Sequence, residues 1–83
     1  MPAVDEFIWI GWNLQKIDNH ALSSDEVEFA WRNGTVVGSG HHPAHGPYWE
    51  TDGTCPSGRV IRIVWRYDDD IDGERKVFVV TAY

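Results

Sequence analysis

The sequence predicts a small α+β domain in which two helices pack on a mostly antiparallel sheet. Helical periodicity is sustained only between residues 12 and 31; one short apolar run precedes it, and strand-like patterns follow it. These observations predict the order β-α-α-β-β-β-β. Because 83 residues suffice for one thin hydrophobic core, we expect a single domain spanning residues 1–83.

The first predicted strand is the run Phe7–Ile10, which is short and rich in β-branched and aromatic residues. Gly11 then turns the chain into the first helix. In that helix Leu14, Ile17 and Ala21 stand at positions i, i+3 and i+7. We expect this apolar stripe to face the core.

The second helix carries clear start and stop signals. Ser23 followed by Glu26 three residues later forms a capping box, and Leu22 with Val27 forms a hydrophobic staple around it. The pair Asn33-Gly34 is a typical end of a helix. The two helices are therefore predicted to meet at a tight corner just before Ser23.

The last four strands are predicted at residues 35–37, 48–51, 60–67 and 76–83. The segments between them are predicted to form a loop or ragged strand edge at 41–47, a turn at 52–58 and an acidic hairpin loop at 68–74. The clearest strand is 60–67, because every second residue from Ile61 to Tyr67 is apolar. One face of that strand should therefore be buried.

The charge and the cysteine content of the chain indicate which kinds of partner and which cellular compartment to expect. Thirteen acidic residues against seven basic ones give a net charge of −6, which argues against nucleic acid as a partner. Five of the seven basic residues nevertheless lie in the last third of the chain, where they can form a local basic patch. The single Cys55 excludes an internal disulfide, and no apolar run approaches the ~18 residues of a membrane span. We therefore expect a soluble, cytoplasmic protein without membrane contact.

Lys16 and His20 are the first candidates for chemistry. They stand at i and i+4 and form, with Asn13, a polar stripe about 90–100° around the predicted helix from the apolar stripe. A ribonuclease without a metal ion needs a group that moves protons, such as histidine, and a cation that holds phosphate, such as lysine. The competing interpretation, which spacing alone favours, is a solvated helix flank with His20 near the helix dipole.

Arginines on one face of the predicted strand 60–67 are the second candidate. Arg62 and Arg66 share that face, and Arg59 lies close by in the sequence. An arginine-bearing face beside aromatic rings suits RNA, because guanidinium groups bind phosphate and rings stack on bases. The alternative is a solvated strand face whose arginines pair with neighbouring acidic residues.

A histidine cluster, His41, His42 and His45, is of the kind that binds zinc, copper or nickel. It lies in a segment rich in glycine and proline, without cysteine or helical spacing, so the metal signal is weak. No metal ion and no other cofactor is predicted.

Two further patterns favour a plain interpretation. The acidic segment 68–73 imitates the first half of a calcium loop, D-x-D-x-D-G, but the twelfth place, which requires glutamate, is Val79. An acidic hairpin turn is therefore favoured over a calcium site. Cys55 stands in a predicted turn with no base near it in the sequence, and we interpret it as incidental.

A series of short motifs runs along nearly the whole chain. They are Phe7-Ile8-Trp9, Trp12-Asn13 with Lys16 and His20, Ser23-Ser24-Asp25-Glu26-Val27-Glu28, Gly58-Arg59-Val60-Ile61-Arg62-Ile63-Val64 and Val79-Val80-Thr81-Ala82. In this order they resemble the BrnT-like toxins, whose fold is related to that of RelE, and a related group of small uncharacterised domains. The fold that this resemblance implies agrees with the element order derived above.

The resemblance implies an endoribonuclease toxin that attacks messenger RNA and is held inactive by a DNA-binding antitoxin. By the matching motifs, Lys16, His20 and Arg62 would form its active site. The residues expected to bind the RNA substrate are Asn13, Tyr48, Arg59, Arg66 and Tyr83. The first hypothesis is thus a toxin-like endoribonuclease that works by general acid–base chemistry without a metal ion.

Two departures from the family's pattern keep other hypotheses open. Pro47 stands before Tyr48 where a basic residue is usual, and Tyr83 stands where an arginine is usual. The second hypothesis is therefore a catalytically inactive relative that serves as a protein-binding module. The third is a metal-responsive protein that uses the histidine cluster.

Overall fold

The computed structural model describes residues 6–69 and 75–83 of the chain. The described elements are β1 (Phe7–Ile8), α1 (Gly11–Asp18), α2 (Ser24–Asn33), β2 (Thr35–His42), β3 (Gly46–Thr54), β4 (Val60–Asp69) and β5 (Arg75–Ala82). The predicted α+β class and the order β-α-α-β-β-β-β are therefore confirmed. Neither helix in this part of the chain has the length and apolar character needed to cross a membrane.

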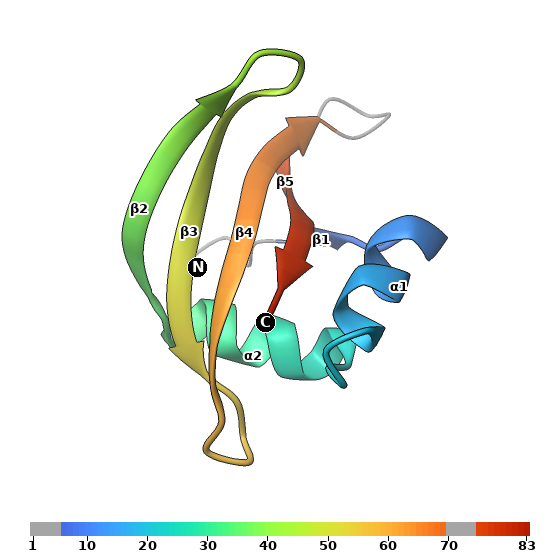
Figure 1. Ribbon diagram of the computed structural model, residues 1–83, viewed down its shortest axis with the longest axis vertical. Coiled ribbons are helices and arrows are strands. Elements are labelled where there is room, and N and C mark those ends of the chain that lie inside the picture. Colours follow the sequence, from blue (N-terminus) through green and yellow to red (C-terminus); the bar gives the residue numbers. More distant parts are fainter. Residues whose placement is uncertain (1–5, 70–74) are drawn as a thin grey trace.

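The strands form one sheet in the order β1-β5-β4-β3-β2. The short strand β1 runs parallel to β5, with Phe7 opposite Val77, and the other neighbouring strands are antiparallel. Figure 1 shows α2 crossing the sheet near the end where the β3–β4 turn lies, with the β2–β3 turn at the far end. Because α2 covers one face of the sheet only, the opposite face of the central strands is not covered by this helix.

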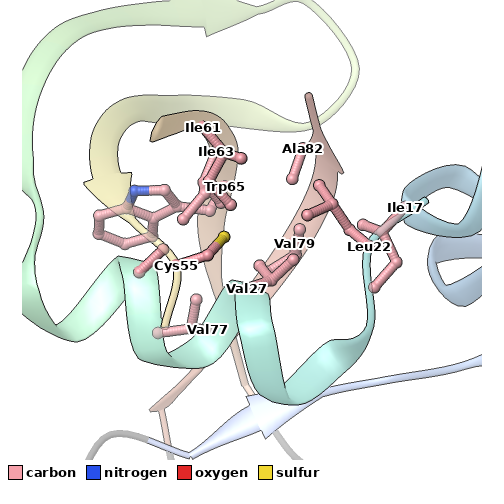
Figure 2. Close-up of a cluster of buried hydrophobic side chains, with 11 residues drawn as sticks. Ile17, Leu22, Val27, Cys55, Ile61, Ile63, Trp65, Val77, Val79 and Ala82 are labelled. Carbon is pink, nitrogen blue, oxygen red and sulfur yellow. The ribbon is translucent and has the colours of Figure 1, made fainter. Parts of the chain in front are cut away.

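The core lies between the helices and one face of β4 and β5. Its buried residues, most of them labelled in Figure 2, are Ile17, Leu22, Val27, Ala30, Cys55, Ile61, Ile63, Trp65, Val77, Val79 and Ala82. The predicted alternation along β4 is confirmed, since Ile61, Ile63 and Trp65 are buried. Complete burial of a valine, leucine or isoleucine side chain stabilises the folded state by roughly 1.5–3 kcal/mol.

The first helix ends earlier than its apolar periodicity predicts. It stops at Asp18, and Ala21 takes a left-handed conformation with φ of 58°. The Leu22 N–H donates to the Ile17 carbonyl at 3.1 Å, and the Ala21 N–H donates to the Asp18 carbonyl at 2.9 Å, which is a Schellman ending. The predicted core stripe is therefore right for Ile17 only, because Leu14 is 40% exposed and Ala21 lies outside the helix.

The second helix begins and ends as predicted. The Glu26 N–H donates to Ser23 Oγ, and the Ser23 N–H donates to the Glu26 carboxylate, so the capping box forms. Leu22 and Val27 are both buried beside it. The helix ends at Asn33. The corner between the two helices is thus built from local signals that the sequence displays.

Strands β2 and β3 are longer than predicted. Of the two alternatives for residues 41–47, the strand edge is right except at the turn between His42 and Gly46, and the predicted turn at 52–58 is wrong for residues 52–54. His42 pairs with Gly46, which leaves a tight turn between them, and β3 runs on to Thr54. β4 includes Asp68 and Asp69, whereas the rest of the predicted acidic loop, 70–74, lies outside the described residues. Glycine occurs both in loops and in strands where the side chains of a neighbouring strand pass close to the backbone, so glycine content alone does not distinguish the two.

Candidate functional site

The sheet face opposite α2, here called the open face, carries most of the candidate side chains. Arg62, Val64 and Arg66 point to it, because they alternate along β4 with buried residues. Their cross-strand neighbours share that face: Asp52 pairs with Arg62, and Glu50 pairs with Val64. A continuous polar and aromatic surface therefore runs along the middle of the sheet.

A hollow of about 490 Å³ lies on this face, here called the sheet-face hollow. Its lining residues are Trp12, His42, His45, Gly46, Tyr48, Glu50, Val64, Arg66 and Val80. A smaller hollow of about 290 Å³ adjoins it and shares four of these residues: Trp12, His45, Arg66 and Val80. The first helix, the β2–β3 hairpin and the two strands β4 and β5 thus meet around one concave place.

Two glycines of β2 decide how Tyr48 and Glu50 lie in the hollow. A Cβ at Gly40 would overlap the Tyr48 ring, and one at Gly38 would stand 2.8 Å from Glu50 Oε2. The Tyr48 and Glu50 side chains therefore extend across the edge strand, where any larger residue would block them. Among the residues that the structure describes, none forms a hydrogen bond or ion pair with the Glu50 carboxylate.

Two imidazoles stand at the turn end of the hollow. The ring centroids of His42 and His45 are 4.8 Å apart, and the rings are tilted by 32°. His42 Nδ1 accepts the Ala44 N–H at 3.0 Å, so in neutral His42 the proton lies on Nε2. His41 points to the other face of β2. In residues 6–69 and 75–83 no group of three histidine, cysteine or carboxylate ligands comes together, so the predicted three-histidine cluster does not assemble.

Two cations flank the hollow and rest on aromatic rings. The Arg66 guanidinium carbon lies 4.5 Å from the centre of the Phe78 ring, and Arg66 Nη1 lies 3.1 Å from Asp68 Oδ2. Lys16 Nζ lies 5.3 Å from the Trp12 ring, which itself stacks on Phe78. Trp12 remains 50% exposed. The predicted residues Lys16, Tyr48 and Arg66 therefore lie in or beside the sheet-face hollow.

Four other predicted residues meet at a second place, here called the C-terminal corner: His20, Arg59, Arg62 and Tyr83. The rings of His20 and Tyr83 are 6.0 Å apart, and Arg59 Nη1 donates to the His20 carbonyl at 2.9 Å. The backbones of Arg62 and Tyr83 are hydrogen-bonded to each other. The prediction that Lys16 and His20 share one helical face is wrong, because α1 ends before His20.

Arg62 is already paired at that corner. Its guanidinium forms two parallel hydrogen bonds with Asp52, Nε to Oδ1 at 2.8 Å and Nη2 to Oδ2 at 3.1 Å. The hydrogen bond from Arg62 lowers the pKa of Asp52, and the same bond raises the pKa of Arg62. The charge of Arg62 is therefore balanced by Asp52 in the free protein, so a phosphate would have to compete with that carboxylate.

Asn13 serves the fold rather than a binding surface. It is fully buried; its Oδ1 accepts the Ile10 N–H at 2.7 Å, and its Nδ2 donates to the Ile8 carbonyl at 2.8 Å. Both ends of its amide thus fix the junction between β1 and α1. Cys55 is also buried, and this burial raises the pKa of its thiol, which keeps it protonated and unreactive.

No protein-family model, curated protein or solved structure matches the chain. The resemblance to BrnT-like toxins therefore stays a prediction. The geometry of the open face is the second observation from which a function can be proposed. Sequence reasoning missed Glu50 and Trp12. A signal for Glu50 was present, since Tyr48 and Glu50 stand two residues apart and so share one face of a strand.

Proposed function

We propose that this protein is a toxin-like endoribonuclease that cleaves RNA without a metal ion, on the open face of its sheet. The observation that carries the proposal is the composition of the sheet-face hollow. A carboxylate that forms no hydrogen bond or ion pair among the described residues, two imidazoles, a phenol and a guanidinium surround one concave place. An exposed tryptophan stands at its rim.

These groups match what cleavage of a phosphodiester requires. A carboxylate or an imidazole can take a proton from the attacking hydroxyl, and an imidazolium can give one to the leaving oxygen. A guanidinium and an ammonium group, such as those of Arg66 and Lys16, stabilise the negative charge that grows on phosphorus. Trp12 offers a flat apolar surface on which an unpaired base can stack.

In this proposal the RNA strand lies along β4. Arg62 and Arg66 stand four residues apart on the open face, a distance of ~13 Å along a strand. One end of that path is the sheet-face hollow, and the other is the C-terminal corner with Arg59 and Tyr83. The corner would then bind the nucleotides that flank the cleaved bond.

The proposed partner is an antitoxin protein in the cytoplasm, as in the toxins that the chain resembles. Strand β2 is the outermost strand of the sheet, and no described strand pairs with its outer side. Val36 and Val37 are half exposed on it. A segment of the antitoxin could add to this edge as a further strand, close to Tyr48 and Glu50, and cover the hollow.

The test is cleavage of a labelled single-stranded RNA by the purified protein in the presence of a chelator. We expect cleavage by the wild type. Trp12→Ala should weaken RNA binding by about 10-fold, because stacking contributes ~1–3 kcal/mol per base. Trp12→Phe should restore part of the affinity, and circular dichroism checks that each variant is folded.

The matched control is Phe29→Ala, which removes a ring that is equally exposed, on the far side of the molecule. It should leave RNA binding unchanged. RNA that stays intact at high protein concentration, or cleavage that stops when the chelator is added, would contradict the proposal. In the first case the protein-binding module becomes the favoured function.

A further inference from the structure

We infer that Glu50 is the general base and His45 the general acid of the reaction, so that both proton-transfer groups come from the β2–β3 hairpin rather than from α1. This inference rests on the proposed ribonuclease function and specifies its machinery. Glu50 and His45 line the same hollow and come from different parts of the hairpin, a strand and its turn. Neither residue belongs to the set that the resemblance to the toxins points to.

The Glu50 carboxylate is suited to accept a proton. It forms no hydrogen bond or ion pair among the described residues, although its charge contributes to the raised pKa of Arg62. It extends over Gly38, where a Cβ would stand 2.8 Å from its Oε2. The other carboxylate at the middle of the open face, Asp52, is occupied by its two hydrogen bonds to Arg62. A base must be within reach of the attacking hydroxyl. The hydrogen bond from Arg62 lowers the pKa of Asp52 and so makes it a weaker base, whereas Glu50 accepts no hydrogen bond among the described residues.

His45 is the better acid of the two imidazoles. It lines both adjoining hollows. In the larger one it shares the lining with Glu50, and in the smaller one with Arg66 and Phe78. His42 has one ring nitrogen occupied by the Ala44 N–H. That bond fixes the His42 ring, and its Nε2–H can then donate a hydrogen bond to a phosphate oxygen. His42 is thus a positioning residue in this scheme.

The C-terminal corner lacks such a pair. His20 contacts the Tyr83 ring, and the Asp52 carboxylate on that end of the open face is bound to Arg62. Arg59 is held by the His20 carbonyl. The corner therefore has groups that can bind a phosphate or stack on a base. Among the described residues it lacks the combination of an imidazole with an unpaired carboxylate that the sheet-face hollow has.

The proposed step transfers one proton at each end of the phosphodiester. Glu50 takes the proton of the ribose 2′-hydroxyl, and the 2′-oxygen forms a bond to phosphorus. The bond between phosphorus and the 5′-oxygen breaks, and His45 gives its proton to that oxygen. Arg66 and Lys16 hold the charged phosphorus centre meanwhile. The products are a 2′,3′-cyclic phosphate and a free 5′-hydroxyl, and exchange with water returns the two protons.

The test compares Glu50→Gln and His45→Asn with the wild type. Each variant should cut RNA at least 100-fold more slowly, as expected for loss of a general acid or base. Binding of an RNA that carries a 2′-deoxy nucleotide at the cut position should change less than ~3-fold, because neither group is needed to hold the strand. Early products of the wild type should end in a 2′,3′-cyclic phosphate.

The matched controls are Asp25→Asn on α2 and His41→Asn on the opposite face of β2, both exposed. Each makes the same chemical change away from the hollow and should cut at the wild-type rate. Wild-type rates in Glu50→Gln and His45→Asn, or products that end in a 3′-hydroxyl, would overturn the inference. If His20→Ala then abolishes cleavage, the ribonuclease function stands with its machinery at the C-terminal corner; if the wild type cuts no RNA, both proposals fail.

Discussion

At the scale of single residues, positions without a bulky side chain or with unusual backbone angles set the geometry of the site. Gly38 and Gly40 leave room for Glu50 and Tyr48 on the open face. Ala21 takes a left-handed conformation and turns the chain from α1 toward α2. These effects are local, so each can be tested with one substitution.

Ala21→Gly should stabilise the protein by about 1 kcal/mol. A left-handed conformation costs a residue with a Cβ roughly 1–2 kcal/mol, and glycine avoids that cost but loses part of the gain through its freer unfolded chain. For a domain of this size the melting temperature should rise by about 4–8 °C. A thermal melt followed by circular dichroism measures it.

The control for this substitution is Gly58→Ala. Gly58 also has a positive φ, 92°, and a Cβ there would meet no atom within 4 Å. The melting temperature of the Gly58→Ala variant should therefore fall because of backbone strain alone. An Ala21→Gly variant that melts at or below the wild-type temperature would show that the turn does not need the left-handed conformation.

At the scale of elements, the approach of α2 to the sheet fixes the distance between the two layers. Gly53 of β3 lies directly under the Ala30 carbonyl of α2, and Gly34 at the end of that helix touches Thr51 and Asp52 in the same way. The side chain of Asn33 adds hydrogen bonds to both backbone groups of Thr54. The helix thus contacts β3 through backbone and glycine rather than through large side chains.

Gly53→Ala should lower the free energy of unfolding by about 1–3 kcal/mol, because the added methyl group forces α2 away from the sheet. Urea denaturation gives the change. Gly11→Ala is the control: a Cβ at Gly11 meets nothing within 4 Å, and alanine favours a helix more than glycine does, so that variant should be at least as stable as the wild type. Equal stability of Gly53→Ala and wild type would mean that the helix–sheet distance is not set at this contact.

At the scale of the whole molecule, the distribution of charge matters more than its sum. The net charge is −6, yet Lys16, Arg59 and Arg66 lie along the open face or at its ends. Acidic residues of α2, such as Asp25 and Glu28, lie on the covered side of the sheet. An acidic protein can therefore offer a local cationic path, but only a weak one.

The salt dependence of RNA binding tests this charge distribution. With three cations that each neutralise one phosphate, the logarithm of the binding constant should fall with that of the salt concentration with a slope of about −2, since a single strand gives about −0.7 per contact. Asp52→Asn releases Arg62 as a fourth cation. That variant should bind RNA more tightly at low salt, with a slope of about −2.8.

The control for the charge effect is Asp25→Asn, which changes the net charge by the same amount on the other side of the molecule. It should leave the slope near −2. Equal slopes for Asp52→Asn and wild type would show that Arg62 does not reach the bound strand. Fluorescence anisotropy of a labelled RNA at several salt concentrations measures all three slopes.

The sequence by itself determined the features that depend on neighbours in the chain. The α+β class and order of elements, the capping box at Ser23, and the alternation of β4 are of this kind. The capping box joins residues three positions apart, and the alternation of a strand has a period of two residues, so both can be recognised within a short segment. The same local logic located Arg62 and Arg66 on one strand face.

Only the tertiary structure decided which of these residues meet. Arg62 and Asp52 belong to different strands, and their pairing follows from the register of β3 and β4. His45, Glu50 and Trp12 come together because a hairpin and a helix converge over the same sheet face. Such contacts join residues far apart in the chain, and their geometry depends on packing that no local pattern encodes.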